Sequence, residues 1–298
     1  RRAQHTKAQR IRGEAALSLP ASDVETVWLT MSPDEKLLYD SYACSDGVPK
    51  WADVNRVTDA TLEDLNTGLG KRRAALASYY GHVGPWQLQQ QAARDAYGRL
   101  ARDTGDGPAD RAARWARLTK FQALKRDLEA LAAASPNASV VIFTHHNVVL
   151  SDVAKMLRAM DWTVFEVSRA SAPSARHSAL RQFQQGASTA GCAAFVTTFS
   201  TAAVGLTLTA ASRVYLLEAS LDPAQEAQAA GRIHRLGQTQ EVLVKRFYFK
   251  DSLDEAVHAL HEKLKAGALA LERGRFPRGA LQVKAATTAS LAPLLYSP

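Results

Sequence analysis

Short apolar runs alternate with amphipathic stretches over the second half of the chain. Five runs have the length and composition of buried strands: Ser139–Thr144, Thr163–Val167, Ala193–Thr198, 214–217 and Val242–Phe249. The stretches between them carry helix start signals, such as Asn147 and Ser174. Because strands that alternate with helices favour a parallel sheet, the pattern predicts an α/β fold.

Two further stretches extend this pattern at its ends. Residues 25–39 predict a strand followed by a helix that Ser32 caps. Ser252 and Glu255 have the spacing of a capping box for a last helix that reaches Lys265. The tail from Leu271 has little periodicity, which favours a loose linker.

A helix with a polar face is predicted after the fourth of these strands. Asp222 can cap it, Pro223 suits its first position, and Gly237 fits the left-handed residue that ends it. Gln225 also has the position of a capping-box partner for Asp222. Four polar residues recur at three- and four-residue spacing and would form one stripe on the helix: Gln225, Gln228, Arg232 and Arg235. Planar, permanently charged guanidinium groups suit a polyphosphate, although two arginines at this spacing also fit a solvated helix face.

Composition narrows the class of protein. The 298 residues fit one large or two modest domains, and the net charge of +8 favours a polyanionic partner. Two cysteines, Cys44 and Cys192, are too few for a disulfide framework or a cysteine-based zinc site. No run of about 18 apolar residues supports a membrane span. We interpret the start at Arg1 as that of a piece cut from a longer chain.

The string from Gln228 to Gln238, Gln-Ala-Ala-Gly-Arg-Ile-His-Arg-Leu-Gly-Gln, resembles the last helicase motif of the Swi/Snf-type ATPases. These form a chromatin and DNA-repair branch of the superfamily 2 helicases. In that family, two arginines reach from the second RecA-like lobe to the phosphates of ATP. The resemblance implies that Arg232 and Arg235 are arginine fingers, and that Gln228 and Gly205 also lie at the nucleotide.

Other segments resemble family motifs in the same order. They are 140–146, which opens the second lobe, 176–183, 198–211 and 218–223. By resemblance, four side chains would lie toward the DNA backbone: His145, Thr198, Ser200 and Thr201. Ala202 and Ala203 depart from the family, because glycines usual at these places allow a close approach to phosphate. The sequence of residues 218–229 most resembles that of the family branch with histone-linker, PHD and RING modules, although this sequence contains no RING.

The resemblance implies three parts. Residues 1–118 would be the end of the first lobe and a mostly helical insert, 119–267 the RecA-like second lobe, and 268–298 a linker. Residues 65–72 resemble a phosphate-binding loop, but Leu65 replaces its first glycine and Arg72 its hydroxyl residue, so 68–72 predict a helix end followed by a basic turn. Asp254-Glu255-Ala-Val-His258 mimics a magnesium box, but its position predicts a solvated helix start instead. The weak match at 72–82 predicts a packed or surface His82.

A basic row in the helical insert has two interpretations. Its members recur at three-residue steps beside an apolar row: Arg111, Arg114, Arg117 and Lys120. The row fits a contact with the DNA backbone, which needs only positioned positive charge. It also fits an ordinary amphipathic helix that packs between lobes, and the apolar residues from Trp115 to Leu131 favour this second interpretation.

The sequence therefore predicts the C-terminal helicase lobe of a DNA-dependent ATPase or translocase in chromatin remodelling or DNA repair. ATP and Mg²⁺ would be held mainly by a first lobe that this chain lacks, so the chain alone should not hydrolyse ATP. The implied partners are double-stranded DNA or nucleosomes, that first lobe and the ubiquitin pathway; the implied location is the nucleus. A non-catalytic DNA- or protein-binding module from a truncated or degenerate gene is one alternative, and a superfamily 2 RNA helicase is another.

Overall fold

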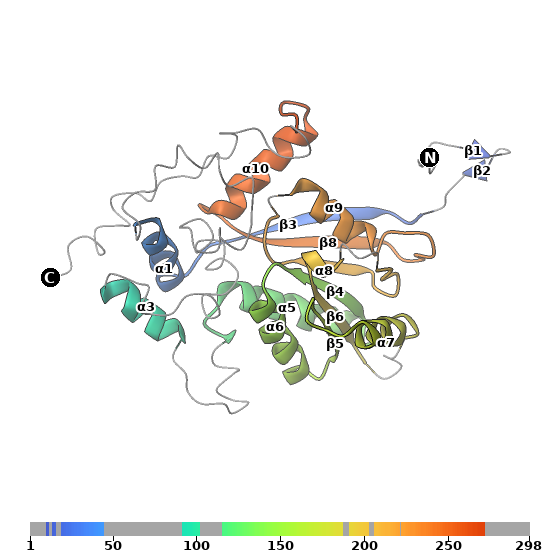
Figure 1. Ribbon diagram of the computed structural model, residues 1–298, viewed down its shortest axis with the longest axis horizontal. Helices are drawn as coiled ribbons and strands as arrows, with labels where there is room; N and C mark the ends of the chain where they lie inside the picture. The colour runs from blue at the N-terminus through green and yellow to red at the C-terminus, as the bar shows by residue number, and fades with distance from the viewer. Residues whose placement is uncertain are drawn as a thin grey trace.

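The chain folds around one parallel sheet. The computed structural model describes residues 10–11, 14–15, 19–44, 91–101, 115–186, 191–202, 206–220 and 222–271. Six parallel strands follow one another in the order β3-β8-β7-β4-β6-β5 (Figure 1). Their bounds are β3 Ser22–Leu29, β4 Ser139–Thr144, β5 Thr163–Val167, β6 Ala193–Thr198, β7 Arg213–Leu216 and β8 Val242–Phe249. The predicted parallel α/β fold is confirmed.

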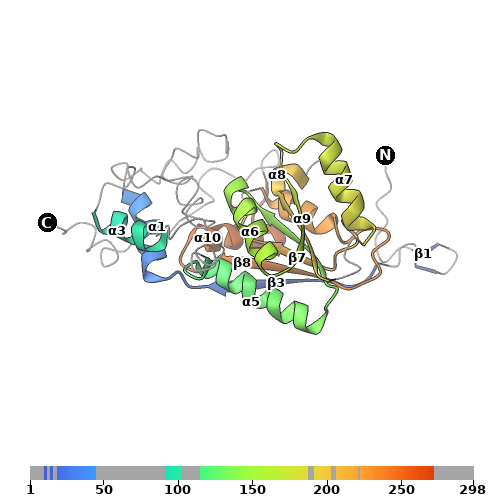
Figure 2. The same cartoon turned by 90° about the horizontal axis from the view of Figure 1, so that it is seen from below.

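Helices cover both faces of the sheet, which makes three layers (Figure 2). On one face lie α5 (Thr119–Ala134) and α6 (Asn147–Ala159), whose buried side chains pack against alternate residues of β4 and β6. On the other face lie three helices: α7 (Pro173–Gln184), α8 (Phe199–Ala202) and α9 (Pro223–Gly231). The central strands β4 and β6 are continuous, mostly apolar runs because they are buried on both sides.

An N-terminal strand belongs to the same sheet. All eight residues of β3 pair with β8, from Ser22 opposite Val242 to Leu29 opposite Phe249. The sheet therefore takes one of its two edge strands from the part of the chain before residue 119. Farther toward the N-terminus, β1 (Arg10–Ile11) and β2 (Glu14–Ala15) form a separate antiparallel pair.

Two helices at the N-terminal side pack together near the carboxyl end of β8 (Figure 1). They are α1 (Pro33–Cys44) and α3 (Gln91–Ala101), joined by an ion pair between Asp34 and Arg99 of 2.6 Å. Ser32 caps α1 as predicted: its hydroxyl accepts from the Glu35 N–H, and the Glu35 carboxylate accepts from the Ser32 N–H. Tyr39 ties α1 to the last helix, because its hydroxyl accepts from the Leu253 N–H.

The last helix, α10 (Leu253–Lys265), ends where the sequence predicted. Ser252 caps it through the Asp254 N–H, at 3.1 Å. Glu255 reaches back to the N–H of Asp251 at 2.7 Å instead of that of Ser252, so the capping box is one residue wider than predicted. The predicted cap of α6 by Asn147 is wrong: the N-cap position is His146, and Asn147 is already the first helical residue.

Some predictions fall on parts of the chain that the structure leaves undescribed. They concern the turn at 68–72, the segment 72–82 and nearly all of the tail after residue 267. Among the described residues, no helix combines the length and the apolar character needed to cross a membrane.

Candidate functional site

The two predicted arginines follow α9 directly. Asp222 caps this helix as predicted, because its carboxylate accepts from the Ala224 N–H at 2.9 Å and Pro223 follows it. The predicted capping-box contact of Gln225 is wrong. Its side-chain oxygen accepts from the hydroxyl of Ser220 at 2.9 Å, and that hydroxyl in turn accepts from the Asp222 N–H at 3.2 Å. Ser220 therefore takes the place expected for Gln225.

The helix ends at Gly231, earlier than predicted, so Arg235 lies beyond it and the single helical stripe is wrong. Residues 232–238 instead form a compact series of turns, which we call the arginine turn. The Arg232 carbonyl accepts from the Leu208 N–H at 2.8 Å, from another loop, and not from the residue four positions later. Glycine also disfavours helix by about 1 kcal/mol relative to alanine. Gly237 has the predicted left-handed conformation (φ +97°), but it closes this turn and not the helix.

Neither arginine of the turn is neutralised by an acid of the described part of the chain. Arg232 is half-buried, and its Nε atom is buried without a hydrogen-bond partner. Arg235 is exposed, and one of its terminal nitrogens donates to the Thr207 hydroxyl at 3.3 Å. No carboxylate of a described residue forms an ion pair with either guanidinium. The two groups therefore have donors left to bind an anion such as a phosphate.

The other two predicted nucleotide residues have different outcomes. Gln228 is exposed on α9, one turn before Arg232. Gly205 lies outside the described residues, as does Ala203. The described residues include no group of three or more His, Cys, Asp or Glu side chains that could hold a metal ion. We therefore assign no described residue as a ligand of the Mg²⁺ that the resemblance implies.

The four predicted nucleic-acid residues gather at the carboxyl ends of two neighbouring strands. Because β4 and β6 pair in parallel, Thr144 lies opposite Thr198, and the residues that follow them meet at one edge. The His145 ring stacks on Phe199 with centroids 4.4 Å apart. Thr198 and Thr201 are buried, with their hydroxyl oxygens 2.8 Å apart, whereas Ser200 is exposed. Of the three hydroxyls, that of Ser200 is the one open to a ligand.

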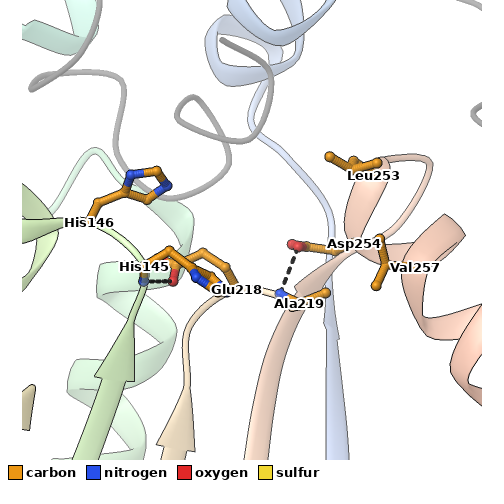
Figure 3. Close-up of a pocket in the computed structure, with 7 residues that line it drawn as sticks. All are labelled: His145, His146, Glu218, Ala219, Leu253, Asp254 and Val257. Atoms are coloured by element: carbon orange, nitrogen blue, oxygen red, sulfur yellow. Dashed lines mark hydrogen bonds between the residues drawn. The ribbon is translucent and has the colours of Figure 1, made fainter. Parts of the chain in front are cut away.

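A small pocket opens at this same edge of the sheet (Figure 3). It is lined by residues that follow β4 and β7 and by the start of α10: His145, His146, Glu218, Ala219, Leu253, Asp254 and Val257. Glu218 is buried, and its two carboxylate oxygens accept from the Thr144 hydroxyl and the His145 N–H, both at 2.9 Å. It thereby fixes the turn that carries His145.

Burial raises the pKa of Glu218 to about 7. The positive charge of Lys120 and the two hydrogen bonds oppose this rise, while the nearby Asp254 adds to it. In the sequence, Glu218 was noted only as an acidic residue within a family motif, and its burial was not predicted. Its place directly after a buried apolar strand is the signal from which an enclosed carboxyl could have been predicted.

We expect Glu218 to make stability depend on pH. Because its folded pKa is raised, the folded chain holds the proton more tightly than the unfolded chain does. Its contribution is therefore full below the unfolded pKa of 4.5 and is lost as pH rises to the folded pKa of about 7. The slope is at most about 1.4 kcal/mol per pH unit.

Urea unfolding at a series of pH values across this window measures the effect. Glu218→Gln keeps the shape of the side chain and cannot titrate, so the difference in unfolding free energy between wild type and variant should fall with pH. Glu166→Gln, on the surface of β5, is the matched control and should leave the profile parallel to that of the wild type. Parallel profiles for Glu218→Gln would contradict the assignment.

A buried ion pair lies behind the pocket. Lys120 and Asp254 are each about 4% exposed, with Nζ and Oδ2 2.9 Å apart. Asp254 also accepts from the backbone N–H groups of Ala219 and Phe249, and Lys120 also donates to the Leu217 carbonyl. Two predictions are therefore wrong: Asp254 is not a solvated helix start, and Lys120 is not part of a surface row.

The rest of the predicted basic row does not form one continuous helical surface in the described residues. Arg111 and Arg114 lie outside the described residues, and the chain leaves the helical conformation between Trp115 and Thr119. The apolar row is buried, from Trp115 at 7% exposure to Leu128 at 0%, but against the sheet of this lobe and not between two lobes as the packing interpretation had it. The apolar row therefore packs α5 and the residues just before it against the sheet.

Comparisons with known proteins agree with this geometry. Residues 119–237 match the model of the helicase conserved C-terminal domain. The DNA repair protein RAD5 of Candida albicans is 32% identical over 149 residues, which is 49% of this chain and 14% of that protein. The chain thus spans only a small part of this relative.

Two solved structures share the fold. The C-terminal part of the Fun30 ATPase domain aligns with a TM-score of 0.57 at 18% identity, over 82% of this chain and 90% of that one. The Sulfolobus solfataricus SWI2/SNF2 ATPase core in complex with dsDNA aligns with a TM-score of 0.54 at 16% identity, over 83% of this chain and 44% of that one. The described fold is that of a helicase C-terminal lobe. Residues 119–237 are thus similar to a helicase C-terminal domain, and the fold agrees with those of the two ATPase structures.

Proposed function

We propose that this chain is the second helicase lobe of a DNA-dependent ATPase or translocase that acts in chromatin remodelling or DNA repair. One observation carries the proposal: the arginine turn presents two guanidinium groups, of Arg232 and Arg235, that no described carboxylate neutralises. Charged donors without an acid partner suit a phosphate ligand. The match of residues 119–237 to a helicase domain supports the same ligand, ATP.

In this proposal the lobe supplies positive charge to phosphoryl transfer. Bound ATP offers a γ-phosphoryl group whose negative charge must be stabilised as it is transferred. Arg232 and Arg235 do this as arginine fingers, while Gln228 would lie beside the nucleotide. A first lobe holds most of the ATP and the Mg²⁺, so we expect negligible hydrolysis by this chain alone.

Double-stranded DNA is the polyanion that we propose for the carboxyl edge of β4 and β6. A solved core of the same fold is described as a complex with dsDNA, and the net charge of this chain is +8. His145, Thr198, Ser200 and Thr201 lie at this edge, with the Ser200 hydroxyl exposed to meet a backbone phosphate. From the resemblance to chromatin and DNA-repair proteins, we also propose nucleosomes and ubiquitin-pathway proteins as partners. On the same ground, we propose that the protein is located in the nucleus.

Binding of duplex DNA to the chain should weaken steeply as salt concentration rises. The logarithm of the binding constant should fall linearly with the logarithm of salt, with a slope of roughly −0.9 per neutralised phosphate. Fluorescence anisotropy with a labelled duplex measures this slope. A flat response would argue against a backbone contact.

A matched pair of variants locates the contact. Ser200→Asp adds one negative charge at the carboxyl edge, and Asn137→Asp adds one at the opposite end of the sheet, where Asn137 is exposed before β4. Only Ser200→Asp should weaken binding, because it repels a phosphate. Equal weakening by both variants would mean a non-local effect of charge.

A non-catalytic binding module is the second candidate. The observation that favours it is in the sequence, where Ala202 and Ala203 replace the glycines that let a backbone approach phosphate closely. Under this candidate, DNA binding remains salt-dependent, but substitution of the arginines has no catalytic consequence.

A further inference from the structure

The arginine turn is hydrogen-bonded to a second loop along most of its length. This loop, residues 206–211, runs between α8 and β7. The Leu208 N–H donates to the Arg232 carbonyl at 2.8 Å, and Arg235 donates to the Thr207 hydroxyl at 3.3 Å. The turn therefore takes its shape from the loop rather than from continued helix.

Gln238 holds the two segments together from the inside. It is 5% exposed, which is unusual for a glutamine. Its amide nitrogen donates to the carbonyls of Ala211, Thr209 and Ile233 at 2.8, 3.2 and 3.3 Å. Its amide oxygen accepts from the N–H groups of Thr239 and Gln240 at 3.0 and 2.9 Å. All of its polar capacity is used on backbone.

Gln184, at the end of α7, holds the same loop from the other side. Its amide oxygen accepts from the Ala210 N–H at 2.8 Å, and its amide nitrogen donates to the Thr207 carbonyl at 2.6 Å. The loop is thus fixed between two glutamines. Of the two, only Gln238 belongs to the arginine turn, and it also bonds the Ile233 carbonyl within that turn.

We propose that Gln238 is a positioning residue, which fixes the loop 206–211 against the arginine turn so that Thr207 can orient the Arg235 guanidinium. The inference rests on the proposed function, because it takes Arg235 as the group that meets phosphate. A buried amide with every hydrogen bond made specifies one arrangement of the segments it joins. Loss of those bonds leaves buried carbonyls unpaired and lets the turn shift.

A displacement of the Arg235 guanidinium should slow catalysis. A displacement of about 1 Å at a reacting group can lower a rate by about 100-fold. Gln238→Met keeps the length of the side chain and removes all of its hydrogen bonds. In a protein with both lobes, we expect it to lower the kcat of DNA-stimulated ATP hydrolysis by about 10- to 100-fold with little change in the KM for ATP.

A double-mutant cycle separates positioning from a loss of folded protein. If Gln238 acts through Arg235, adding Gln238→Met to Arg235→Ala should cause no further loss of kcat. A purely structural role would lower the folded fraction and multiply the two losses. Multiplied losses, or no effect of Gln238→Met alone, would overturn the inference. Gln240→Met, at an exposed position two residues later, is the matched control.

Thr207→Val keeps the test decisive if Gln238→Met does not fold. It removes only the hydroxyl that accepts from Arg235 and preserves the shape of a half-buried side chain. We expect a smaller loss of kcat, roughly 3- to 10-fold, again absent on the Arg235→Ala background. Full activity of Thr207→Val beside impaired Arg235→Ala would contradict the orientation by Thr207.

The two levels of the account fail differently. If the two-lobe protein does not hydrolyse ATP, the proposed function fails. If it does but Arg235→Ala leaves hydrolysis unchanged, the arginine-finger role fails, and with it the positioning role of Gln238. If Arg235→Ala abolishes hydrolysis while Gln238→Met and Thr207→Val are as active as wild type, only the positioning role fails.

Discussion

Replacing Arg235 by alanine in a protein that contains both helicase lobes should lower the rate of ATP hydrolysis by about three to five orders of magnitude. The reason is electrostatic: the guanidinium has no described acid partner, so its charge is available for the phosphoryl group during transfer. The change should fall on kcat, because charge that develops in the transition state is what the arginine stabilises. Steady-state hydrolysis at saturating duplex DNA measures it.

Two control variants sharpen this result. Arg181→Ala removes an exposed arginine of α7, and we expect no comparable loss. Arg235→Lys keeps the charge but not the planar fork, so its activity should lie between those of wild type and Arg235→Ala. Wild-type kcat for Arg235→Ala would remove the arginine finger from the account.

Replacing Lys120 by methionine should destabilise the chain itself by about 3–5 kcal/mol. The substitution removes the cation that faces the buried Asp254 and leaves that carboxylate without its partner. It also removes the donor to the Leu217 carbonyl at the end of the sheet. Urea unfolding of the 298-residue chain at neutral pH measures the difference in the free energy of unfolding.

A surface pair on the same helix is the control. Lys125 and Glu129 are each about half exposed and lie 3.5 Å apart. Lys125→Met should cost less than about 1 kcal/mol, because exposed ion pairs contribute little. Adding Asp254→Asn to Lys120→Met should recover part of the stability, since the buried charge is then gone. Equal effects of the two lysine substitutions would contradict a special role for Lys120.

The strands were predictable because their cause is local. The central strands β4 and β6 are runs of mostly apolar residues buried on both faces, and the predicted bounds of β4, β5, β6 and β8 match the observed ones. The caps at Ser32, Asp222 and Ser252 were predictable for the same reason, because the side chain and its acceptor or donor lie within three residues.

Two of the errors came from partners distant in the sequence. Asp254 resembled a solvated helix start until its contact with Lys120, 134 residues away, showed it buried. Likewise, the polar stripe was predicted to continue along α9, but the Leu208 N–H takes the Arg232 carbonyl and the helix ends. Neither contact has a local signal, since each depends on how the sheet brings separate segments together.

The most direct test of the account is ATP hydrolysis by the two-lobe protein and by this chain, each with and without duplex DNA. We predict DNA-stimulated hydrolysis by the two-lobe protein and none by the chain alone, because in the proposed function the arginine turn supplies charge to ATP that a first lobe would hold. Hydrolysis by the isolated chain would contradict the division of roles between the lobes. An inactive two-lobe protein would instead support a module that binds without turnover.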